Sequence, residues 1–309
     1  MKKILLALAV LASMQVANAQ VKSAADAKKA VEAAEAAASN EKKAIKTATW
    51  IKLGQEYVKA YDAPTGNIIP GSSKTELALM MGSEKPVSTE AVEIQGTPYT
   101  KEVYADKNLY FNANGQLAVI EVTKPVYADA LEKAIAAYQK AYDLDASHAK
   151  SKDIAAAFDL IGQKYNTEAY NKYTLGDLAS ASKYFEKAAE VEALAPLSKI
   201  DTTSIYNAGF TAWATKDMSK AKELFEKCYN LGYYYEGGEV FAKLADVDTL
   251  NTKKYLEEGF EKFPQSQSIL IGLINYYLKS NESTDRLFEL LDKAKANEPN
   301  NASLFYVEG

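Results

Sequence analysis

Residues 175–191 read LGDLASASKYFEKAAEV, a short turn followed by an amphipathic helix that begins near Leu178. In this helix Ala181, Phe185 and Ala188 place a small, an aromatic and a second small side chain on one face. Small residues on both sides of a ring allow a neighbouring helix to approach closely. The stretch therefore predicts the second member of a tightly packed helix pair.

The same small–aromatic–small spacing returns forty residues later, and looser versions follow twice more. The three further sets are Ala221, Phe225 and Cys228; Thr252, Leu256 and Gly259; and Leu287, Leu291 and Ala294. Pro264 and Pro299, which follow the last two sets, are 35 residues apart. This period predicts an array of stacked helix pairs from Lys152 onward.

A matching first helix occurs far upstream, where residues 50–57 read WIKLGQEY. Its partner is not the next segment, because the same spacing reappears only at Ala134, Tyr138 and Ala141. We infer one helix pair split by an insertion at residues 62–126. Such a split costs little, since the entropy of closing a surface loop grows slowly with its length.

The insertion has a different character from the rest of the chain. Its aromatic and β-branched runs predict three strands, Tyr99–Tyr104, Leu109–Asn112 and Leu117–Thr123. The sequence Ala113-Asn114-Gly115 supplies a hairpin turn between the last two. A short helix is expected at Thr75–Met81.

Trp50, Leu53, Gly54 and Tyr57 match the pattern W-x2-L-G-x2-Y, so the chain resembles the tetratricopeptide repeat (TPR) family. With its export signal and β insertion, the chain is similar to secreted TPR proteins of Bacteroidetes-type bacteria. The resemblance implies a mainly α fold, a TPR-type helical solenoid with a small β-containing insertion in the first repeat. It also implies a concave face, lined by first helices, that binds partners, and it implies no chemistry.

These patterns divide the chain into consecutive parts. The division is a signal peptide at 1–19; an N-terminal capping helix at 20–45; a split first TPR at 46–61 and 127–148; the inserted segment with a β-hairpin at 62–126; and a TPR array at 149–309. The last helix begins at Phe305 and stops at Gly309, so the final repeat is expected to be truncated and followed by more repeats in a longer protein.

The N-terminus has the layout of a cleavable export signal. Lys2 and Lys3 precede an apolar run from Ile4 to Met14, and Ala17-Asn18-Ala19 forms a cleavage site. The run is roughly half of the ~20 residues that span a bilayer, and no cysteine follows for lipid attachment. We therefore expect a periplasmic or secreted protein without stable membrane insertion.

Composition argues against most kinds of chemistry. The formal net charge is −5, and Arg286 is the only arginine, which disfavours nucleic acid and clamped anions. His148, in a polar turn, and Cys228, at a small packing position, are the only residues of their types. We expect neither a metal site nor a cofactor, and no enzyme activity.

The functional hypothesis is a scaffold that binds a protein or peptide partner in the cell envelope. The alternative is a carbohydrate- or small-ligand-binding module that uses an aromatic groove. Both would use aromatic residues predicted on the concave side: Tyr170, Tyr173, Tyr206, Phe210, Trp213, Tyr234, Phe241 and Tyr276. Packing of these rings between repeats is the competing interpretation, and spacing alone does not decide between them.

Overall fold

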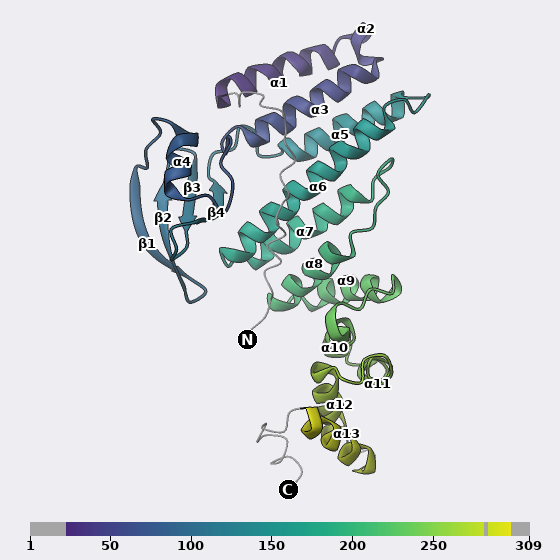
Figure 1. Cartoon of the computed structure of the whole chain (residues 1–309). Coiled ribbons are helices and arrows are strands. Elements are labelled where there is room, and N and C mark those ends of the chain that lie inside the picture. Colours follow the sequence, from purple (N-terminus) through teal and green to yellow (C-terminus); the bar gives the residue numbers. More distant parts are fainter. Residues whose placement is uncertain (1–22, 281–283, 298–309) are drawn as a thin grey trace. The chain divides into compact units, whose positions relative to one another are not determined.

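The computed structural model describes residues 23–280 and 284–297, and it is mainly helical (Figure 1). Its elements fall into two compact units. Of the described residues, the first contains 23–92 and Tyr99–Leu144, and the second contains Glu93–Pro98, 145–280 and 284–297. The signal peptide and the truncated final repeat predicted from the sequence lie outside the described residues.

Among its described residues, the first unit holds five helices and a small sheet, except that the end of β1 and the start of β2, within Glu93–Pro98, belong to the second unit. Their bounds are α1 Ala24–Ala38, α2 Glu41–Ala44, α3 Thr47–Asp62, α4 Lys74–Met81, β1 Ser88–Ile94, β2 Thr97–Val103, β3 Lys107–Phe111, β4 Leu117–Val122 and α5 Ala130–Leu144.

Helices α3 and α5 pack against each other although the whole insertion separates them in sequence (Figure 1). Gly54 of α3 lies against Tyr138 of α5, and a Cβ atom at Gly54 would be only 2.7 Å from that ring. A glycine is therefore needed at this point of closest approach. Helix α1 covers the outer side of α3 with Ala27, Val31 and other small buried side chains.

The insertion forms a four-stranded antiparallel sheet in the order β1–β2–β3–β4. Strand β3 is buried along its whole length, and its Leu109 lies opposite Ile120 of β4. Helix α4 contributes Leu77 to the same small core, together with Phe111 and Leu117. The helix begins at a capping box, in which Ser73 and Glu76 each bond to the other's backbone amide.

The second unit is a succession of helices in which each packs on the next. Their bounds are α6 Ser151–Thr174, α7 Leu178–Glu192, α8 Thr202–Ala214, α9 Met218–Asn230, α10 Glu239–Val247, α11 Thr252–Lys262, α12 Gln267–Ser280 and α13 Thr284–Asn297, with a short 3-10 turn at Glu236–Gly238.

The predicted small–aromatic–small sets form the core of this second unit. Ala181, Phe185, Phe225 and Cys228 are all buried, and Gly209 of α8 gives Phe225 of α9 room for a close approach. The buried position predicted for Cys228 is thereby confirmed. The mainly helical, TPR-like fold class with a β-containing insertion is confirmed as well.

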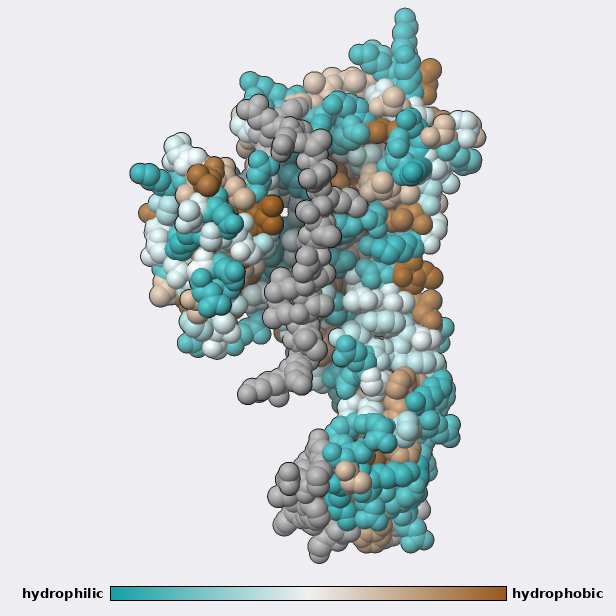
Figure 2. Space-filling view, in the orientation of Figure 1, coloured by the Kyte–Doolittle hydropathy of each residue, from teal (hydrophilic) through white to brown (hydrophobic). Residues whose placement is uncertain are grey.

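Among the described residues, no helix combines the length and the apolar character that crossing a membrane requires. On the face displayed in Figure 2, outside the grey atoms, hydrophobic residues are scattered among hydrophilic ones.

Candidate functional site

Side chains of α6, α8 and α10, the first members of successive helix pairs, contact one another from pair to pair. We call the surface formed by these side chains and by the α9–α10 loop the first-helix face. One part of it consists of hydrogen-bonded polar groups, and the other part consists of aromatic rings. The two parts differ in how many of their groups already interact with other residues of the protein.

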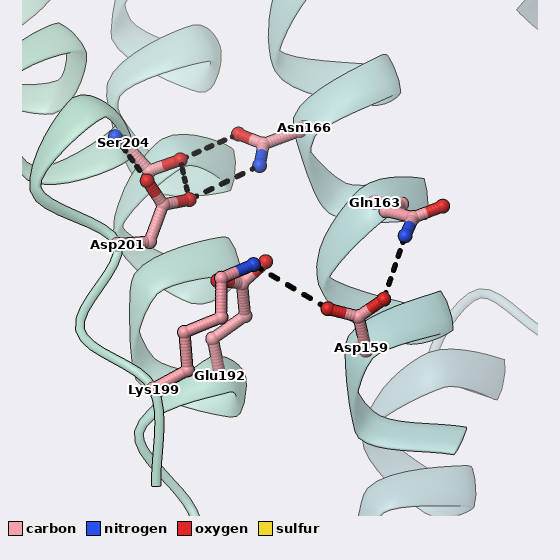
Figure 3. Close-up of polar contacts among 7 residues, drawn as sticks. All are labelled: Asp159, Gln163, Asn166, Glu192, Lys199, Asp201 and Ser204. Carbon is pink, nitrogen blue, oxygen red and sulfur yellow. Dashed lines mark hydrogen bonds and ion pairs between the residues drawn. The ribbon is translucent and has the colours of Figure 1, made fainter. Parts of the chain in front are cut away.

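The polar part joins α6 to the start of α8 (Figure 3). The Ser204 hydroxyl lies 2.8 Å from Asn166 Oδ1 and also within hydrogen-bonding distance of Asp201. Asp201 accepts a bond from the Ser204 backbone amide at 3.0 Å and so caps the N-terminus of α8. Asn166 Nδ2 donates to the other Asp201 oxygen at 3.3 Å. One short network therefore fixes both the helix start and its position against α6.

A second polar group surrounds Glu192, a carboxylate only 2% exposed at the end of α7. Lys199 Nζ lies 2.9 Å from Glu192 Oε2 and 3.4 Å from Asp159 Oδ1 (Figure 3). The other oxygen of Asp159, Oδ2, accepts a bond from Gln163 Nε2 at 2.7 Å. Gly162 makes room for Glu192, because a Cβ atom there would lie 2.8 Å from the Glu192 Cγ atom.

The Glu192 carboxyl group and the Lys199 ammonium group both have raised pKa values. Burial raises the pKa of Glu192, and the charges of Asp201 and Asp159 raise it further, while Lys199 lowers it. The hydrogen bond from Lys199 to Glu192 raises the pKa of the lysine. The two shifts have the same sign for different reasons, since burial is the main cause for Glu192 and the hydrogen bond to Glu192 is the main cause for Lys199. These polar side chains bond chiefly to one another, so we interpret this part as a connection between helix pairs.

The aromatic part begins with two stacked rings. Tyr206 of α8 is 5% exposed, and Tyr235 of the α9–α10 loop stacks on it with centroids 4.0 Å apart and planes at 11°. Tyr233 lies beside Tyr235, with centroids 6.3 Å apart. Tyr235 has φ of +56°, a strained conformation for a residue with a side chain, and the stacking on Tyr206 holds it there.

Trp213 connects α8 to α10. Its Nε1 donates to Asp246 Oδ2 at 2.5 Å, and Lys243 Nζ lies 3.4 Å from the ring centroid. Phe210 lies one turn earlier, with the same ammonium group 5.6 Å from its ring. Burial lowers the pKa of Lys243, and Glu239 and Asp246 partly offset the effect. The indole N–H group and the ring of Trp213 are thus already engaged within the protein.

Tyr170 is the most exposed aromatic residue of this face, at 45%. Its ring packs edge-on against Phe185, with centroids 5.1 Å apart, and its hydroxyl accepts a bond from Asn207 Nδ2 at 3.2 Å. The ring is therefore held in one orientation while nearly half of its surface remains in solvent.

The structure brings together only part of the predicted aromatic set. Tyr170, Tyr206, Phe210 and Trp213 belong to the first-helix face, and Tyr173 near the end of α6 is partly buried against the core of the second unit. Tyr206 was predicted as a binding residue, but its ring is buried beneath Tyr235 and has little surface to offer.

Phe241 and Tyr234 require a correction. Phe241 is completely buried, because Gly259 of α11 has no side chain and leaves the space that this ring fills. The Tyr234 ring stacks on Phe241, and its hydroxyl accepts a bond from Lys262 of α11 at 3.1 Å. The Tyr276 ring has Lys253 of α11 at 5.8 Å. Tyr234 thus contacts a second helix and does not join the aromatic part, whereas Tyr276 is partly exposed on α12 and its place in a binding groove stays a prediction.

Tyr233 and Tyr235 were missed as site residues, although the run Tyr233-Tyr234-Tyr235 was evident in the sequence. The rings of this run face different neighbours, because Tyr234 stacks on Phe241 whereas Tyr235 stacks on Tyr206. The three consecutive tyrosines could have indicated that some of them belong to the site. The sequence alone does not show which of them face the first-helix face.

No family model matches the chain, and no curated protein matches it. Among solved structures, YrrB, described as a TPR protein with an unusual peptide-binding site, is 20% identical with a TM-score of 0.37, covering 58% of this chain and 83% of that one. The Cut9–Hcn1 hetero-tetramer of APC/C is 12% identical with a TM-score of 0.36, covering 91% of this chain and 45% of that one.

A third similar structure is the C-terminal part of a TPR repeat-containing protein from Cytophaga hutchinsonii. It is 15% identical with a TM-score of 0.35, and the match covers 92% of this chain and 94% of that one. At these values the similarities say nothing about what this chain binds. Among the described residues, no group of three or more histidine, cysteine or acidic side chains is arranged to hold a metal ion.

Proposed function

We propose that this protein is a non-enzymatic TPR scaffold that binds a protein or peptide partner in the cell envelope through the aromatic part of its first-helix face. The observation that supports this most directly is the 45% exposure of Tyr170, a ring anchored at its hydroxyl and edge. Tyr233 and Tyr235, both partly exposed, belong to the same face.

Tyrosines suit this role because they offer a large contact area while losing little conformational entropy on binding. Here the cost is lower still, since Tyr170 and Tyr235 are already held by Asn207 and Tyr206. The polar network around Ser204 keeps α6 and α8 in fixed register. Such preorganisation favours affinity by reducing what is lost on association.

Site-specific photocrosslinking tests the proposal in living cells. A photoreactive phenylalanine analogue at Tyr170 should yield a defined protein adduct that excess unlabelled protein competes away. The control carries the analogue at Leu250, which is 94% exposed in the turn between α10 and α11 and lies off this face. Equal adducts at both positions, or no protein adduct together with specific binding on a glycan array, would overturn the proposal.

Location in the envelope is part of the proposal and rests on the signal-like residues 1–19. We expect the mature protein, beginning near Gln20, in periplasmic or culture fractions prepared without detergent. N-terminal sequencing of the purified protein would locate the cleavage point. Recovery only from washed membranes would contradict this part of the proposal.

A further inference from the structure

Four tyrosines, Tyr170, Tyr206, Tyr233 and Tyr235, converge from α6, α8 and the α9–α10 loop, and we call them the tyrosine patch. Tyr206 is its floor, and Tyr235 stacks over that floor at 4.0 Å. The Tyr233 hydroxyl lies 3.5 Å from Thr203 Oγ1. Tyr233 acts electrostatically on Tyr170, and both act on Tyr235, in agreement with the contact of Tyr233 and Tyr235 at 6.3 Å.

The patch differs from several other aromatic clusters of the protein in its relation to cations. Elsewhere the chain covers rings with its own lysines: Lys133 over Tyr57 and Tyr127, Lys187 over Tyr165, and Lys262 over Tyr234. Within residues 23–280 and 284–297, no lysine or arginine lies over the four rings of the patch. Lys243 of α10 lies over Trp213 and Phe210 instead.

Carboxylates also border the patch. Glu236 directly follows Tyr235, Glu239 begins α10 four residues after it, and both act electrostatically on the Tyr235 hydroxyl. Within the described part of the chain, neither carboxylate forms an ion pair or a side-chain hydrogen bond. Asp201 adds a third negative charge near Tyr170. Electron-rich ring faces and nearby carboxylates, of which Glu239 also acts on Lys243, together create a negative potential that favours a cation.

We propose that the tyrosine patch, with Glu236 and Glu239, binds a basic side chain of the peptide partner, arginine in preference to lysine. A guanidinium group is planar, so it can stack on a tyrosine face while its edge donates to a carboxylate. This inference rests on the proposed peptide-binding function and adds the charge of the partner to it.

The probe is a random peptide library displayed on phage and selected on the purified protein at low salt. Selected peptides should share an arginine or lysine, and a synthetic copy of the best peptide should bind more weakly as salt is added. Replacing that arginine by glutamine should weaken binding about three- to tenfold, the range expected of a partly exposed cation–π contact with a nearby carboxylate.

Variants of the protein then locate the contact. Tyr170→Leu and Glu236→Gln should each reduce the preference for the arginine peptide over its glutamine copy, whereas a general loss of folding would weaken both peptides alike. Glu261→Gln is the matched control, because Glu261 is an exposed glutamate of α11, away from the patch.

The outcomes separate this inference from the proposed function. If no selected peptide binds in solution, the peptide-binding function and the basic-side-chain inference both fail. If peptides bind at Tyr170 without a basic residue, or if their arginine preference survives both variants, only the inference fails.

Discussion

Glu56, on α3, shows how a single buried charge should set the acid stability of this protein. Its side chain is 2% exposed, and Lys52 and Lys59 lie 2.6 and 2.9 Å from its Oε1. Burial raises the pKa of Glu56, but the two lysines outweigh that effect and hold the pKa at about 2, below its ordinary 4.5. The carboxylate therefore stabilises the fold above pH 4.5, and this contribution is lost as the pH falls toward 2.

We expect Glu56→Gln to lower the free energy of unfolding at pH 7 by up to about 3 kcal/mol, the equivalent of the pKa shift. The difference between the variant and the wild type should shrink steadily between pH 4.5 and pH 2. Urea titrations at several pH values measure it. A difference that stays constant over this range would show that the ion pairs do not control acid stability.

Cys228 is a second residue whose surroundings fix its behaviour. It is fully buried on α9, and burial raises the pKa of its thiol to about 12. We expect Cys228→Ala to cost about 1 kcal/mol or less, and the larger Cys228→Leu to cost about 1 to 3 kcal/mol by overpacking. Chemical unfolding compares the variants. Rapid labelling of the native protein by a thiol reagent would contradict the buried assignment.

At the scale of elements, Trp213 connects one helix pair to the next. Its bond to Asp246 and its contact with Lys243 both reach from α8 to α10. Trp213→Ala should therefore lower the free energy of unfolding by about 1 to 3 kcal/mol, less than for a fully buried ring. The more exposed Tyr170→Ala should cost less than about 1 kcal/mol. Thermal unfolding of both variants tests this order, and an unchanged melting temperature for Trp213→Ala would refute the connecting role.

Helix patterns were predictable from the sequence because burial repeats at helical spacing over many residues. The small–aromatic–small set of Ala181, Phe185 and Ala188 is buried in α7 as expected. Strand β1 was missed because Glu90 and Glu93 interrupt its apolar residues, and its side chains are mostly exposed. An exposed edge strand leaves little hydrophobic signal in the sequence.

The candidate site was harder to predict because it depends on contacts between distant residues. Gly259 on α11 decides that Phe241 is buried, although the two residues belong to different helices. Lys243 and Asp246 gain their importance only from the position of Trp213. Residue types at helical spacing indicate which helix faces are apolar. They do not show which residue from another helix packs against a given aromatic ring.

At the scale of the whole molecule, the insertion between α3 and α5 poses a question of cooperativity. The sheet and α4 share their own small core of Leu77, Leu109, Phe111 and Leu117. Helices α3 and α5 meet directly through Gly54 and Tyr138, without a residue of the sheet between them. The helix pair and the inserted sheet thus have separate sources of hydrophobic stabilisation.

We therefore expect replacement of residues 62–126 by a short Gly-Ser linker to leave a folded helical protein that unfolds in one cooperative transition. A shorter connection also lowers the entropy cost of joining α3 to α5, although only slightly, because this cost varies with the logarithm of loop length. Circular dichroism during urea unfolding measures the transition, and Gly54→Leu in the same shortened protein is the control, since its side chain would collide with Tyr138. Two outcomes would contradict the expectation. A broad, non-cooperative transition in the shortened protein would show that the helix pair needs the sheet, and an unaffected Gly54→Leu variant would show that α3 and α5 do not pack as described.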